Sequence, residues 1–179
     1  MLAYLFVLLA VLVRVVSGTG AFATLGFTPV GASLLFFGSR MSRKHFLAPV
    51  ALLIGSDLFL NYKIYGLPLT WDQAVVWAWY VGACFIGMFL RDRVKPLYVA
   101  GAALASSISF FLISNFAVWL VGNIGYPRTL SGLAACYAAA VPFLRTGVVS
   151  DLLFSTVFFG TAALVNHARQ TIASRSAAA

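Results

Sequence analysis

Long apolar runs, separated by short stretches that contain Gly, Pro or charged residues, dominate this chain. Most of the runs approach the roughly 20 residues that a helix needs to span a bilayer. No polar stretch is long enough for a linker, so residues 1–179 are expected to form a single transmembrane domain with a flexible tail at 170–179. The breaks between runs predict helices at about 2–18, 30–41, 45–61, 72–90, 97–121, 129–143 and 148–167.

Basic residues near the ends of these runs predict how the helices cross the membrane. Placing all of the basic clusters in the cytoplasm satisfies the positive-inside rule. Residues 122–168 must then make one net crossing, so 129–143 is expected to be a half-helix that stays on the outer side. A seven-crossing arrangement, with the last cluster outside, is the alternative. The clusters are Arg40, Arg43 and Lys44; Arg91, Arg93 and Lys95; and Arg169 with Arg175.

Composition supports this class of protein. The chain is 62% hydrophobic and 9% charged, whereas a soluble domain is roughly half apolar and about a quarter charged. The expected fold is therefore all-α: a polytopic six-helix transmembrane bundle with an additional outer half-helix and cytoplasmic termini. Since the net charge of +8 resides mainly at helix ends, the bilayer is the expected partner and no nucleic acid is expected. Cys84 and Cys136 lie in apolar runs and are interpreted as buried small residues.

Asp151 is the first candidate for a binding residue. It lies one turn into the last predicted helix, after an expected break at Arg145, Thr146 and Gly147. Irregular backbone at membrane depth persists only where protein or water satisfies it, so the break predicts a cavity open to the outside. An intramembrane carboxylate needs a partner. Asp151 is therefore either a structural acid, paired with Arg145 or a helix N-terminus, or a ligand-binding group, with Arg145 taking a ligand carboxylate.

Other polar and aromatic residues within the apolar runs are candidates too. Asp57 lies in the outer third of the helix predicted at 45–61, and the amide of Asn115 needs partners inside its helix. Trp71 marks the interface, and Trp77 contributes either packing or a stacking platform for a planar ligand. Two intramembrane aspartates suggest an aspartyl protease, but no other feature supports one. No metalloprotease, redox or phosphate-loop motif occurs, so no enzyme activity, metal site or cofactor is predicted.

Two motifs carry a resemblance to a known family. FTPVGASLLFFGSR combines a Pro-Val segment with a Gly-containing short helix that ends in Gly and a basic residue. GLAACYAAAVPFLRTGVVSDLLFSTVFFG combines a small-residue half-helix, Pro-Phe, a break, an Asp and a final helix. This order resembles the substrate-binding S components of energy-coupling factor (ECF) vitamin transporters, the biotin type above all. The chain is also similar to an uncharacterised bacterial membrane family with the strings FTPVGA and SNFAVW.

The resemblance implies a protein of the bacterial inner membrane that binds a vitamin-like solute from outside, for uptake with an ATP-driven coupling module. It implies that Asp151 lies in the pocket and that Thr28 and Pro29 lie in the first lid loop. Two features depart from the family: bulky residues replace its Ala-x-x-x-Ala surface on the first helix, and the Lys that often follows the final Asp is absent. The alternative interpretation is a non-transporting partner or structural subunit of a membrane complex.

Overall fold

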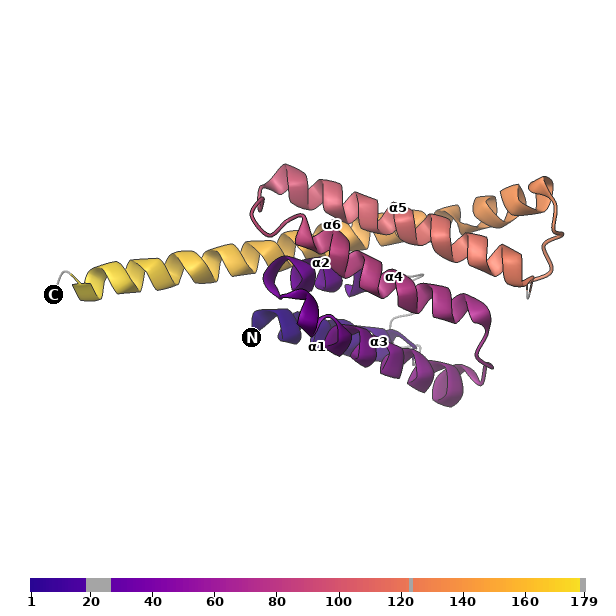
Figure 1. The fold of residues 1–179 in the computed structure, drawn as a ribbon, viewed down its shortest axis with the longest axis horizontal. Coiled ribbons are helices and arrows are strands. Elements are labelled where there is room, and N and C mark those ends of the chain that lie inside the picture. Colours follow the sequence, from indigo (N-terminus) through magenta and orange to yellow (C-terminus); the bar gives the residue numbers. More distant parts are fainter. Residues whose placement is uncertain (19–26, 123, 178–179) are drawn as a thin grey trace.

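The computed structural model describes residues 1–18, 27–122 and 124–177, and these are helical apart from short connections (Figure 1). The expected all-α class is confirmed for this part of the chain, which contains no strand. A 3-10 turn, η1 (Arg43–His45), precedes α3, and a π-helix, η2 (Leu60–Tyr65), continues it. The α-helices are α1 (Leu2–Gly18), α2 (Val30–Arg40), α3 (Leu47–Phe59), α4 (Trp71–Met88), α5 (Pro96–Val121) and α6 (Leu130–Ala177).

Helix α2 lies at the centre of the bundle. All of its residues from Val30 to Ser39 are buried, and it packs against α1, α4, α5 and α6. Glycine allows the close approach to α4: a Cβ on Gly38 would overlap the carbonyl oxygen of Cys84, and one on Gly87 would overlap that of Leu35. Small residues permit this kind of contact between membrane helices, where packing replaces the hydrophobic effect as the driving force.

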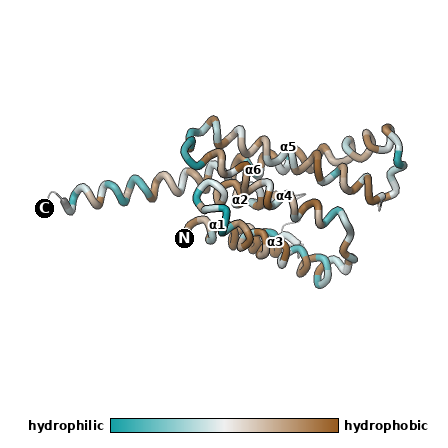
Figure 2. Tube along the Cα trace, viewed as in Figure 1, coloured by the Kyte–Doolittle hydropathy of each residue, from teal (hydrophilic) through white to brown (hydrophobic). Residues whose placement is uncertain are grey.

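Three helices of the described chain are long and apolar enough to cross a membrane: Arg43–Tyr65, Pro96–Val121 and Leu130–Ser176. Helix α1 is a shorter apolar helix, and the apolar colouring extends through the whole bundle (Figure 2). These helices indicate a membrane protein. At 1.5 Å per residue, the 11 residues of α2 span only about 16 Å, which is too short to cross a bilayer core of about 30 Å. The six-crossing arrangement remains a prediction.

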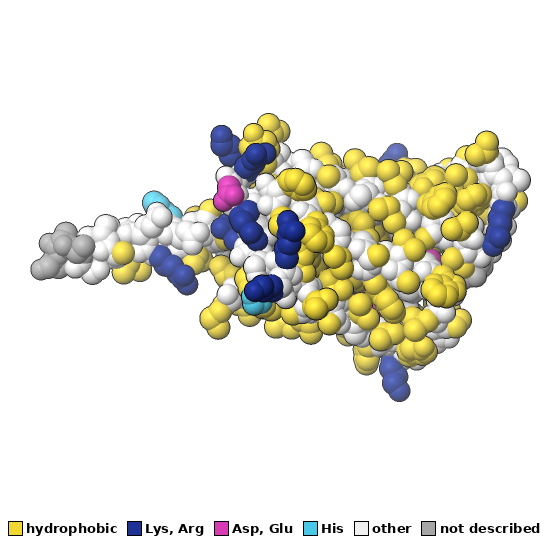
Figure 3. Space-filling view, in the orientation of Figure 1, with side chains coloured by type: hydrophobic (Ala, Val, Ile, Leu, Met, Phe, Trp, Pro, Cys, Tyr) yellow, Lys and Arg dark blue, Asp and Glu magenta, His cyan; other side chains and the backbone are white. Residues whose placement is uncertain are grey.

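Successive helices run in opposite directions, so that the start of α1 and the C-terminal part of α6 lie at the same end of the bundle (Figure 1). Most Lys and Arg side chains on the visible face gather at that end (Figure 3). The first two basic clusters meet there, because the guanidinium of Arg91 donates a hydrogen bond of 2.6 Å to the carbonyl oxygen of Met41. We call this the basic end of the bundle.

The break expected after residue 143 is absent, because residues 130–177 form one continuous helix. The half-helix at 129–143 and the separate helix at 148–167 were therefore wrong, and the expected tail is helical as far as Ala177. Residues 178–179 lie outside the described residues. Pro142 lies inside α6, and the hydroxyl of Thr146 donates to its carbonyl oxygen at 3.1 Å. Lipid offers no hydrogen bonds to an open backbone, so Pro and Gly are tolerated within membrane helices.

Helix α6 is longer than any membrane is thick. Its 48 residues rise about 72 Å at 1.5 Å each, against about 40–45 Å for a bilayer with its headgroups. The C-terminal part accordingly projects beyond the other helices at the basic end (Figure 1). Helix α6 is thus long enough to make, on its own, the one net passage that the charge pattern predicts between residues 122 and 168.

Candidate ligand-binding site

A cavity of about 570 Å³ lies among α2, α4, α5 and α6, and Arg14 of α1 also lines it. Gln73 near the start of α4 and Tyr126 in the α5–α6 connection are among its lining residues, so it occupies the end of the bundle opposite the basic end. Ile124 and Phe143 line the cavity and are 65% and 51% exposed. The cavity therefore reaches the surface of the protein.

Asp151 of α6 borders the cavity where α6 meets the N-terminus of α2. Its side chain is buried, and its two oxygens accept hydrogen bonds from the Ala32 backbone N–H at 3.2 Å and the Ser107 hydroxyl at 2.7 Å. Gly31 makes this approach possible, because a Cβ there would overlap the carboxylate. The neighbouring Ser150 donates to the carbonyl oxygen of Thr28 at 2.8 Å. Asp151 thus caps a helix that is distant in sequence, at its positive end.

A second polar cluster joins α1, α3 and α4. Asp57 is buried and forms an ion pair with Arg14, whose other terminal nitrogen donates to the Tyr80 hydroxyl at 2.7 Å. One Asp57 oxygen also accepts from Tyr80 at 3.0 Å and from the indole N–H of Trp77 at 2.9 Å. Arg14 and Tyr80 line the cavity whereas Asp57 does not. The cavity therefore meets the guanidinium, and the carboxylate that balances it lies behind.

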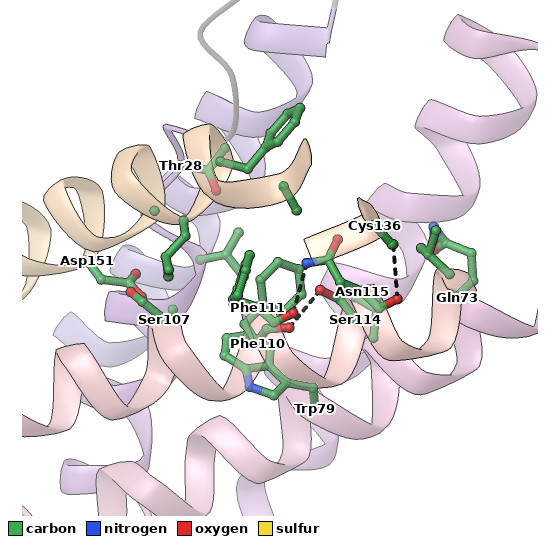
Figure 4. A pocket seen from close by; sticks show the side chains of 18 of the residues that line it. Thr28, Gln73, Trp79, Ser107, Phe110, Phe111, Ser114, Asn115, Cys136 and Asp151 are labelled. Carbon is green, nitrogen blue, oxygen red and sulfur yellow. Dashed lines mark hydrogen bonds between the residues drawn. The ribbon is translucent and has the colours of Figure 1, made fainter. Parts of the chain in front are cut away.

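The wall between Asp151 and Gln73 is largely aromatic (Figure 4). Phe110, Phe111 and Trp79 lie along it, and the rings of Trp79 and Phe110 are 4.7 Å apart between centroids. Asn115 lies between these rings and Cys136, and its amide donates to the carbonyl oxygen of Phe111 at 2.8 Å. A mostly apolar cavity with a few polar groups is typical of small-molecule sites.

The structure brings together some of the residues predicted from the sequence. Asp151, Asn115 and Thr28 line one cavity. Pro29 is fully buried beside Thr28 as the N-cap of α2. The part of the predicted lid loop at residues 19–26 lies outside the described residues.

Other candidates lie elsewhere. Arg145 is exposed on α6, does not line the cavity and forms no ion pair with Asp151. Trp71 is 83% exposed and is likewise not a lining residue. Trp77 and Asp57 belong to the cluster behind Arg14. The structural pairing of Arg145 with Asp151 was therefore wrong, because it assumed a break that α6 does not have.

Arg14 is a charged cavity residue that sequence reasoning missed, as it missed the lining residues Ser107 and Gln73. A usable signal was present, since an intramembrane charge requires a partner. Arg14 and Asp57 lie at corresponding depths, near the far ends of two apolar helices that start at the basic end. Asp57 and Asp151 have separate partners, and the described residues show no hydrogen bond between the two carboxylates.

A model of a family of unknown function, DUF6580, matches residues 1–174. The chain belongs to this family. No curated protein and no solved structure matches it. The DUF6580 match includes every residue that lines the cavity, so the cavity lies within the part of the chain that defines the family.

Proposed function

We propose that this protein binds a small, vitamin-like solute within the membrane and takes part in its uptake, as S components do. The observation that carries the proposal is the cavity of about 570 Å³ with a buried carboxylate on its wall. Its volume lies within the roughly 300–1,000 Å³ of small-molecule sites. A chain built only to pack against a partner has no need of such a space.

The position of the cavity supports capture from outside the cell. Positive-inside orientation places the basic end in the cytoplasm, and the cavity lies at the opposite end. Its exposed lining residues, such as Ile124, then border the outer side of the membrane. A solute would enter there and meet Asp151 at the inner limit of the space, beside the N-terminus of α2.

The outer face of helix α1 is where the resemblance would place the docking of an ATP-driven module. The small residues Ala3 and Ala10 of α1 are buried in the core, and leucines such as Leu5 and Leu12 cover its outer side at 56% and 60% exposure. The outer face of α1 therefore offers no small-residue surface. An ATP-driven module would dock on a different face of this protein than it does in the family that the sequence resembles.

One observation favours the alternative, a partner or structural subunit of a membrane complex. Both oxygens of Asp151 are bonded within the chain, to Ala32 and Ser107, so the carboxylate also stabilises the position of α2. This structural role needs no ligand. The two functions differ in what fills the cavity.

Thermal unfolding of the detergent-purified protein with a panel of vitamins and small metabolites separates them. A ligand at a hundredfold excess over its Kd stabilises the native state by about 2.7 kcal/mol. We expect a specific hit that is lost in Ala140→Trp, which fills the cavity from a buried lining position. The hit should persist in the surface variant Arg145→Ala. A flat panel together with a co-purified membrane protein would support the partner subunit instead.

A further inference from the structure

The charges around the cavity do not balance. Arg14 and Asp57 neutralise each other. Asp151 has a hydroxyl and a backbone N–H as partners but no cation within ion-pair distance. The undescribed residues cannot supply one, since 19–26, 123 and 178–179 contain no Lys, Arg or His. Among the residues that line the cavity, Arg14 and Asp151 are the charged ones, and only Asp151 lacks a counter-ion.

The N-terminus of α2 compensates this charge only in part. A helix N-terminus is equivalent to roughly half an elementary charge, and it reaches Asp151 through a single hydrogen bond from Ala32. A carboxylate on a cavity wall, away from bulk water, interacts strongly with whatever charge the ligand brings. A cationic group of a ligand in the cavity would neutralise the charge of the Asp151 carboxylate, whereas an anionic group would be repelled by it.

The aromatic wall favours the same ligand charge. The rings of Trp79, Phe110 and Phe111 line the cavity beyond Asp151 (Figure 4). Aromatic faces attract cations through their quadrupole, most strongly in desolvated sites, and cages of such rings recognise quaternary ammonium groups. The same rings accept the apolar body of an organic molecule, which a hydrated inorganic ion lacks.

A buried acceptor without a partner lies at the other end of the cavity. The side-chain oxygen of Gln73 is buried without a hydrogen-bond partner in the structure, and Gln73 lines the cavity far from Asp151 (Figure 4). Ser114 and Asn115, which also line the cavity, donate to the carbonyl oxygens of Phe110 and Phe111. A ligand satisfies this end by donating a hydrogen bond.

We propose that the cavity selects organic cations: small molecules with a protonated or quaternary nitrogen against Asp151, an apolar or aromatic body along the α4–α5 wall, and a donor for Gln73. This inference rests on the proposed function and specifies its substrate class. It reverses the ligand charge expected from Arg145, which lies outside the cavity.

Three probes that share a benzyl body test the charge preference: benzyltrimethylammonium, benzyl alcohol and phenylacetate. Each is titrated at millimolar concentration against the full-length protein in detergent, with the unfolding temperature and equilibrium binding as readouts. We expect only the cation to bind. Its affinity should fall on the order of tenfold or more in Asp151→Asn, which removes a buried charge from the pair. Arg145→Gln changes a charge outside the cavity and should retain the preference.

The outcomes are distinct. Binding of phenylacetate or benzyl alcohol at least as tight as that of the cation would overturn the charge assignment and leave the proposed binding function intact. Cation binding that is unchanged in a folded Asp151→Asn protein would overturn it as well. If that variant does not fold, the comparison of the three probes on the wild-type protein decides. If no probe binds, the organic-cation assignment fails, and the metabolite panel alone decides the proposed function.

Discussion

Replacing Arg14 by methionine should be the most damaging single change to the polar cluster behind the cavity. Arg14→Met keeps an unbranched, shorter side chain and removes the cation that pairs with Asp57. Asp57 is 2% exposed, so its carboxylate is not in contact with bulk water. The variant thus leaves an uncompensated charge in the protein interior, held only by the N–H of Trp77 and the hydroxyl of Tyr80.

Breaking a buried ion pair from one side costs about 3–5 kcal/mol. Asp57→Asn should cost less, because its side chain still accepts from Trp77 and Tyr80, and the Arg14 side chain left behind is 24% exposed and borders the cavity. The double variant Arg14→Met/Asp57→Asn has no unpaired charge. It should therefore be more stable than Arg14→Met alone, with a coupling of about 0.5–3 kcal/mol, the range for groups in contact.

The free energy of unfolding can be measured by titrating SDS into mixed micelles and following tryptophan fluorescence. Arg145→Met makes the same chemical change at an exposed position of α6, and should stay within roughly 0.5 kcal/mol of wild type. The reasoning fails if Arg14→Met costs under about 1 kcal/mol, or if the double variant loses the full sum of the two single losses.

Three further predictions concern packing and topology. A Cβ at Gly87 would overlap the backbone of α2, whereas one at Gly82 on the same helix would meet open space. Gly87→Ala should therefore destabilise the protein by about 1–3 kcal/mol, and Gly82→Ala should be neutral or stabilising by about 0.5–1 kcal/mol. Equal effects of the two substitutions in the same SDS titration would contradict the close α2–α4 contact. Gly31→Ala should also destabilise the folded protein, because the added Cβ displaces the Asp151 carboxylate that caps α2. If the variant unfolds at the same SDS concentration as the wild-type protein, this cap contributes little. In a cysteine-free background, a membrane-impermeant thiol reagent outside intact cells should label Leu67→Cys but not Ser174→Cys, and the reverse pattern would invert the orientation.

The apolar runs and the breaks between them predicted the helix positions well where a helix is uninterrupted. The expected helices at 2–18 and 97–121 coincide closely with α1 and α5. Helix α5 starts with Pro96 and is followed by Gly122, which has a φ of +77°, and such signals hold in lipid as in water. The prediction failed for α6, where Arg145, Thr146 and Gly147 were interpreted as a break. In hydrocarbon the cost of opening the backbone exceeds that of retaining a helix-breaking residue.

The same error led to the wrong prediction that Arg145 lies beside Asp151. Within a continuous helix of about 100° per residue, six positions place Arg145 about 240° around the axis from Asp151, so the two side chains leave α6 in different directions. Asp151 and Asn115 could be found because a polar group in an apolar run must face a cavity or a partner. The pairing of Arg14 with Asp57 bridges two helices and could not be read from either run alone.

Native mass spectrometry of the protein purified from cells tests the central claim most directly, namely that the cavity is a ligand site. The wild-type protein, incubated with a metabolite extract of its cells, should retain a small molecule that is absent from Ala140→Trp and present in Arg145→Ala. Spectra of wild-type protein without any bound small molecule, or with the same bound species in Ala140→Trp, would contradict the account.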